Sequence, residues 1–135
     1  MERGGQRSKT TGRTFAVLAV DDDALILMHT AAMLEEMGFV AFEAMSGRQA
    51  LEILRREKAI DVVITDQAMP HMTGDQLAAA IRAEWPNLPI LLASGYDEPG
   101  DPGLKLPRLG KPFRQEELAR AIADAIHSGH QVSAD

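Results

Sequence analysis

The chain of 135 residues contains no cysteine. It therefore has neither a disulfide nor a thiolate zinc site, which is consistent with a reducing cytoplasm. It also lacks a long apolar run: its first 14 residues read MERGGQRSKTTGRT, and no later segment approaches the length of a membrane span. We expect a cytoplasmic protein without membrane insertion.

Positive charge is also scarce. The chain has 14 basic against 20 acidic residues and a formal net charge of −6. DNA binding usually needs a basic face, so the composition argues against a nucleic acid as the direct partner. The length suits one domain. We divide the chain into a flexible N-terminal tail (1–13), a domain (14–127) and a flexible C-terminal tail (128–135).

Short apolar runs recur along the domain and predict β-strands. Runs that are apolar throughout are typical of parallel strands covered by helices on both faces. They lie at 15–20, 39–44, 60–65 and 88–93, with a weaker candidate at 108–109.

Helical patterns fill the intervals between these runs. One covers residues 24–37 and should end at Gly38; Ser46 should cap a second, and Thr73 or Gly74 should open a third. A last helix should follow Phe113. The alternation predicts an α/β fold with a doubly wound parallel sheet. Residues 95–110, GYDEPGDPGLKLPRLG, are too rich in proline and glycine for a regular helix, so we expect a loop or a distorted turn there.

Acidic residues gather where the first strand ends, at Asp21, Asp22 and Asp23. Neighbouring carboxylates repel each other unless a cation lies between them, and Mg²⁺ commonly binds one or two carboxylates and several waters. A simpler interpretation is that all three acids cap the following helix. We expect Asp23 to be the cap, and Asp21 and Asp22 to be the better metal ligands.

Three other polar residues follow or end predicted strands: Asp66, Ser94 and Lys111. Functional groups gather at this edge of a parallel sheet. A carboxylate can attack phosphorus, and such transfer needs neutralisation of the phosphoryl oxygens, which Lys111 and the Ser94 hydroxyl would assist. Taken alone, Lys111 could be a solvated lysine and Ser94 a turn residue. Pro112 favours a backbone that aims Lys111 inward.

Four segments resemble the receiver domain of response regulators in two-component signalling. They are VLAVDDD (17–23), VVITDQAMPHMTG (62–74), LLASGY (91–96) and LGKPF (109–113). The resemblance extends to stand-alone receivers and to those attached to hybrid histidine kinases. It implies a flavodoxin-like, five-stranded parallel sheet in the order 2-1-3-4-5, here with a shortened or irregular fourth helix.

The resemblance also assigns roles to residues. Asp66 would be the phosphoacceptor, Ser94 the switch hydroxyl and Lys111 the phosphate-sensing lysine. Mg²⁺ would be held by Asp21, Asp22, Asp66 and the main-chain carbonyl of Ala68. The domain would be a regulatory phosphoacceptor that catalyses only its own phosphorylation and dephosphorylation. Its donor would be a histidine kinase or histidine phosphotransfer protein docked near the first helix, and its downstream protein is unknown.

The predicted switch region departs from the family pattern. The family usually has an aromatic residue three positions before the lysine, where this chain has Arg108. An aromatic rotamer change therefore cannot be the readout, unless Tyr96 or Phe113 has taken over part of it. The short interval between Ser94 and Lys111 also puts the usual dimerisation mode in doubt. We expect the loop at 95–107 to repack on phosphorylation and to change the affinity for a partner.

Three alternatives remain at this point. A phosphatase of the haloacid dehalogenase type needs a threonine where this chain has Leu25. A phosphorylation-independent interaction module on the same fold is kept open by Arg108. A flavin-binding protein is disfavoured, because the turn after the first strand is acidic where a phosphate-binding loop is needed.

Overall fold

The computed structural model describes residues 14–95 and 106–134, with side-chain surroundings given up to residue 127. Five parallel strands form one sheet in the order β2-β1-β3-β4-β5, as the resemblance implied. The strand boundaries differ by only one or two residues from those predicted. The strands are β1 (Ala16–Val20), β2 (Val40–Ala44), β3 (Val62–Asp66), β4 (Ile90–Ser94) and β5 (Arg108–Gly110).

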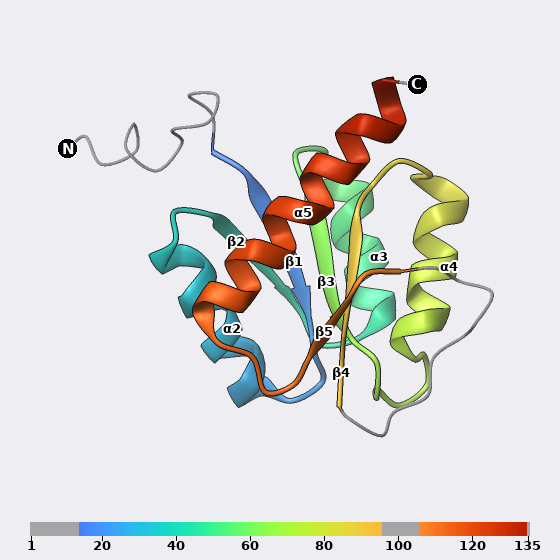
Figure 1. The fold of residues 1–135 in the computed structure, drawn as a ribbon. Helices are drawn as coiled ribbons and strands as arrows, with labels where there is room; N and C mark the ends of the chain where they lie inside the picture. The colour runs from blue at the N-terminus through green and yellow to red at the C-terminus, as the bar shows by residue number, and fades with distance from the viewer. Residues whose placement is uncertain (1–13, 96–105, 135) are drawn as a thin grey trace.

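Four helices cover the sheet, with α2 and α5 on one face and α3 and α4 on the other (Figure 1). Helix α5 continues past residue 127, where the sequence suggested the end of the domain. Most of the segment expected to be irregular, 95–110, falls on residues 96–105, outside the described residues; its last three residues form β5. The helices are α2 (Ala24–Glu36), α3 (Gly47–Arg56), α4 (Gly74–Glu84) and α5 (Gln115–Ala134).

The helix ends agree with the signals in the sequence. The side chains of Asp23, Ser46 and Thr73 each accept a hydrogen bond from a backbone N–H in the first turn of the helix that follows. Helix α2 ends at Glu36 with Met37 as its cap, and the chain then turns at Gly38, whose φ of 96° suits glycine. The Gly38 N–H donates to the Glu35 carbonyl, which closes the last turn.

The core lies on both faces of the sheet, and β1, β3 and β4 are buried along their whole length. Leu27 and Leu34 of α2 pack with Leu118 and Ile122 of α5 on one face. Burial on both faces explains the uninterrupted apolar runs of these strands. It also holds their carboxyl ends on a rigid scaffold.

Two methionines lie at the surface of the domain. Met28 and Met45 are 57% and 45% exposed. Met28 follows the buried Leu27 directly, and adjacent positions on a helix point in different directions, so its side chain faces outward. Within the described ranges, no helix has both the length and the apolar character needed to cross a membrane.

Candidate functional site

The candidate site lies at the carboxyl edge of the sheet, at the bottom of Figure 1. Asp21 directly follows β1, Asp66 is the last residue of β3, and Lys111 directly follows β5. Because β1 and β3 are adjacent and paired up to Thr65, the chain brings Asp21 and Asp66 together from strands far apart in the sequence.

Three carboxylates meet at this edge. Asp21, Asp22 and Asp66 each offer an oxygen, and these oxygens all lie within 4.8 Å of one another. Asp21 and Asp66 are buried, with 8% and 5% of their surface exposed, whereas Asp22 is exposed. The structure thus brings together the three acids that the sequence proposed as metal ligands. Ala68, the fourth proposed ligand, is exposed in the loop two residues after Asp66.

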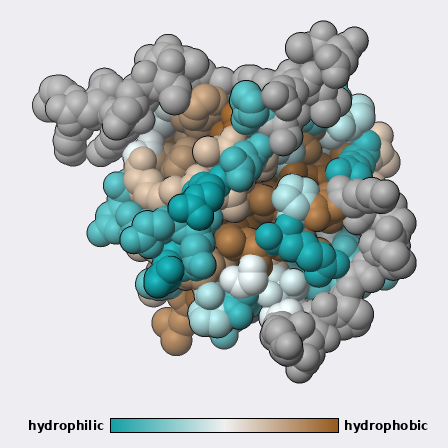
Figure 2. Space-filling model, viewed as in Figure 1, coloured by the Kyte–Doolittle hydropathy of each residue, from teal (hydrophilic) through white to brown (hydrophobic). Residues whose placement is uncertain are grey.

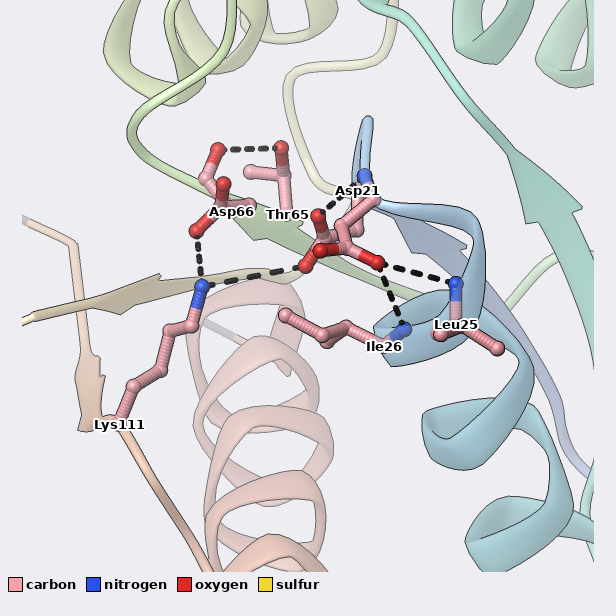
Figure 3. A network of polar contacts seen from close by, with 7 residues as sticks. Asp21, Leu25, Ile26, Thr65, Asp66 and Lys111 are labelled. Carbon is pink, nitrogen blue, oxygen red and sulfur yellow. Dashed lines mark hydrogen bonds and ion pairs between the residues drawn. The ribbon is translucent and has the colours of Figure 1, made fainter.

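Lys111 points into the acidic cluster, as its neighbour Pro112 suggested. Its Nζ lies 2.6 Å from Asp66 Oδ1 and 3.9 Å from Asp21 Oδ2, and Figure 3 shows the side chain reaching between these two acids. The Lys111–Pro112 peptide bond is cis. Among the described residues, Lys111 is the one lysine paired with these three acids, so the described part of the cluster has an excess of negative charge.

The excess of negative charge affects the pKa of Asp21. Burial raises the pKa of its carboxyl, and the negative charges of Asp66 and Asp22 raise it further. The hydrogen bond from the Asp23 N–H, which lies 2.9 Å from Asp21 Oδ1, and the charge of Lys111 oppose this effect. All the donors are oxygens, which hard divalent cations prefer. The residues therefore fit a divalent metal in both charge and donor type.

The backbone around Asp66 is fixed by close packing against the start of α4. A Cβ built at Gly74 would lie 2.5 Å from the carbonyl oxygen of Asp66, too close for any residue except glycine. Two hydrogen bonds of 2.9 Å join the amide group of Gln67 to the Asp75 side chain and backbone N–H. The sequence analysis gave no role to Gln67 and Asp75; a glycine at the start of a helix was the only signal available.

Ser94 ends β4 and is buried, with 6% of its surface exposed. Its strand lies next to β3, where Asp66 pairs with Ala93. Its hydroxyl accepts a hydrogen bond from Arg108 Nη1 at 3.3 Å, a contact that the sequence did not indicate. Tyr96, the other residue of the predicted switch region, lies outside the described residues.

An apolar surface lies beside the acidic cluster on α2. Leu25, Ile26 and Met28 are 74%, 40% and 57% exposed, and Figure 2 shows hydrophobic surface at the lower left, over the start of this helix. A groove separates α2 from the segment after β5, and Leu25 and Phe113 lie on its two sides. Lys111 also lines the groove, which connects this surface with the acidic cluster.

Comparisons with known proteins agree with this fold. The family model of the response regulator receiver domain matches residues 17–123. The solved structure of a response regulator receiver domain protein from Clostridium thermocellum has a TM-score of 0.77 to this chain and is 26% identical in sequence; the match covers 87% of this chain and 98% of that one.

Two curated relatives are much longer proteins. The sensor kinase CckA of Brucella abortus is 29% identical over 133 residues, covering 93% of this chain and 14% of the kinase. The transcriptional regulatory protein GlrR of Escherichia coli (strain K12) is 33% identical over 115 residues, covering 82% of this chain and 26% of the regulator. The chain thus spans about a quarter or less of the length of these relatives.

Proposed function

Because this chain belongs to the response regulator receiver domain family, we propose that it accepts a phosphoryl group on Asp66 in a Mg²⁺-dependent reaction. A receiver domain is the regulatory part of a two-component system. The donor in this proposal is a histidine kinase or a histidine phosphotransfer protein. The observation that carries it is the convergence of Asp21, Asp22 and Asp66, with Lys111 bonded to Asp66.

The proposed transfer forms one bond and breaks one. A carboxylate oxygen of Asp66 attacks the phosphorus, and the bond between phosphorus and the imidazole nitrogen of the donor breaks. The imidazole leaves with the electron pair and takes up a proton from water. Lys111, already 2.6 Å from Asp66 Oδ1, places a positive charge beside the incoming phosphoryl oxygens.

The carboxylate of Asp22 and the main-chain carbonyl of Ala68 would hold the metal together with Asp66, and Asp21 would act through a bound water. When bound, Mg²⁺ neutralises charge on the phosphoryl oxygens. The surplus of negative charge around Asp21 supports this part of the proposal.

The donor would dock on α2. The exposed apolar residues Leu25, Ile26 and Met28 support this position. The groove between α2 and the segment after β5 supports it too, because it is also lined by Lys111, which contacts Asp66. The added charge of about −1.5 to −2 would then draw in Lys111 and Ser94 and change the affinity for a downstream protein. The proposal also includes a cytoplasmic location and a protein, not a nucleic acid, as the direct partner.

Phosphorylation by a small donor tests the proposal. The chain would be incubated with phosphoramidate and Mg²⁺, and its intact mass measured. We expect one phosphoryl group on the wild type and on Asp124→Ala, a matched control at an exposed position of α5. We expect none with EDTA or on Asp66→Ala. An unmodified wild type would instead favour the phosphorylation-independent interaction module, and an adduct that persists in Asp66→Ala would place the chemistry elsewhere.

A further inference from the structure

The side chain of Arg108 on β5 reaches Ser94 on the adjacent strand β4. Leu92 pairs with Arg108 and Ser94 with Gly110, so Arg108 and Ser94 are diagonal neighbours on the same face of the sheet. Arg108 is exposed, yet its Nη1 lies 3.3 Å from the hydroxyl oxygen of the buried Ser94. The distance is at the long end for a hydrogen bond, so the contact can tighten.

No described residue crowds the space beside Gly110, next to this contact. Gly110 lies beside Ser94 in the pairing, and no described atom lies within 4 Å of a Cβ built at this glycine. An arginine side chain has several rotatable bonds, so its guanidinium can follow a small movement of the hydroxyl without displacing a neighbour. This freedom matters because the phosphoryl group would extend beyond the end of β3.

The chemistry of the two groups fixes the direction of the hydrogen bond. A guanidinium only donates, whereas a hydroxyl has one proton and two lone pairs. When Arg108 donates to a lone pair of Ser94, the hydroxyl proton remains available for another acceptor. A phosphoryl oxygen on Asp66 would be such an acceptor, and the positive charge of Arg108 would make the hydroxyl a stronger donor.

The charge at the site favours the same arrangement. An aspartyl phosphate carries about −1.5 to −2. Together with Asp21 and Asp22, it carries about half to one negative charge more than Lys111 and a divalent cation can offset. The guanidinium of Arg108 is a cation linked to the edge of the site through Ser94, so it supplies the missing charge.

We infer that Arg108 is the positioning residue for Ser94: it stays bonded to the hydroxyl, directs the hydroxyl proton to the phosphoryl oxygen and adds a positive charge to the phosphorylated site. This inference rests on the proposed function, with Asp66 as the phosphoacceptor. It replaces a rotamer change of an aromatic side chain with a polar link between the site and the exposed end of β5.

Affinity for beryllofluoride, a stable mimic of the phosphoryl group, tests the inference. Binding would be measured by ¹⁹F NMR with Mg²⁺ present. We expect Arg108→Gln to bind about tenfold more weakly than the wild type, a usual size for a coupling between groups in contact. Arg120→Gln, which removes the same charge from an exposed position of α5, should bind like the wild type. Arg108→Lys, which keeps a charged donor, should recover part of the loss.

A double-mutant cycle separates positioning from a general charge effect. Ser94→Ala should weaken beryllofluoride binding, and adding Arg108→Gln in that background should change it by less than about twofold. The affinity of the wild type should also fall more steeply with salt than that of Arg108→Gln. Thermal unfolding without ligand would check that each variant folds.

Several outcomes would overturn the inference. They are equal affinity of Arg108→Gln and the wild type, tighter binding by Arg108→Gln, or a full additional loss in the Ser94→Ala background. Failure of the proposed function looks different: the wild type itself would bind no beryllofluoride and gain no phosphoryl group on Asp66.

Discussion

Two ion pairs of this molecule are similar in distance and differ in almost everything else. Arg55 of α3 and Glu84 of α4 form a pair at 2.8 Å, with side chains 55% and 46% exposed. Lys111 and Asp66 form a pair at 2.6 Å in which the Asp66 side chain is only 5% exposed. The surface pair contains one charge of each sign, whereas the buried pair belongs to a cluster with three acids.

The difference indicates which charges serve folding and which serve a ligand. In the surface pair, the hydrogen bond from Arg55 lowers the pKa of Glu84, so the partners stabilise each other, although water screens the gain. In the buried cluster, burial and neighbouring acids raise the pKa of Asp21. A cluster of this kind opposes folding until a cation binds, and such pKa shifts are typical of functional sites.

The largest expected effect is on phosphoryl transfer. Lys111→Ala removes the positive charge that contacts Asp66, and we expect phosphorylation by phosphoramidate to slow about 100-fold, as for the loss of one donor to a developing charge. Arg55→Ala should leave the rate unchanged, because this arginine pairs with Glu84 between α3 and α4. Equal phosphorylation rates for the wild type and Lys111→Ala would show that the Lys111–Asp66 pair contributes no more to phosphoryl transfer than the surface pair does.

Mg²⁺ binding should stabilise the protein through the acidic cluster and not through the surface pair of Arg55 and Glu84. At a Mg²⁺ concentration 100 times the dissociation constant, the free energy of unfolding should rise by about 2.7 kcal/mol. Asp22→Asn should lose most of this gain, since it removes a carboxylate of the cluster. Glu84→Gln is the matched control and should keep it. Chemical denaturation at several Mg²⁺ concentrations measures this gain for the wild type and for each variant.

The packing beneath the acidic cluster offers a test of its rigidity. Gly74→Ala places a methyl group against the carbonyl of Asp66, and we expect a loss of about 1–3 kcal/mol in unfolding free energy. Gly110→Ala is the control, because its methyl group meets no described atom within 4 Å. If both variants unfold at the same denaturant concentration, the close approach between Gly74 and the Asp66 carbonyl does not contribute to stability.

A smaller effect should appear in the metal-free protein as pH changes. The pKa of Asp21 is raised on folding above its ordinary value of 3.8, so the folded state binds this proton more tightly and loses stability as pH rises above that value. Asp21→Asn should lack this part of the decline, while its amide oxygen can still accept the Asp23 N–H. Unfolding in EDTA between about pH 4 and pH 7 measures the difference. If the difference in unfolding free energy between the wild type and Asp21→Asn stays constant over this pH range, the pH dependence does not come from Asp21.

Much of the fold was predictable because its signals are local. Asp23 caps α2 and Gly38 ends it through contacts within a few residues, and the strands are marked by their own apolar composition. The convergence of Asp21 and Asp66 was predictable from the general rule that parallel strands end at one edge. The assigned roles of Ser94 and Lys111 in phosphorylation stay predictions.

The contacts that the sequence did not reveal depend on pairing between distant segments. The hydrogen bond from Arg108 to Ser94 arises from the register of β4 and β5, which no local pattern specifies. The exposure of Met28 depends on how α2 is rotated against the sheet.

The smallest expected effect concerns the surface pair itself. Arg55→Gln should leave the melting temperature within experimental error of the wild type, because exposed ion pairs contribute little. Differential scanning calorimetry at low and high salt measures it. A large drop that disappears in salt would show that the surface pair matters more than its exposure indicates.

The most direct test of the account is a crystal structure with Mg²⁺ and beryllofluoride. The account predicts beryllium on a carboxylate oxygen of Asp66, with the metal bonded to Asp22, Asp66 and the carbonyl of Ala68. A metal bound away from these residues, or beryllofluoride on another side chain, would contradict the claim that the three acids form a cation site around a nucleophilic carboxylate.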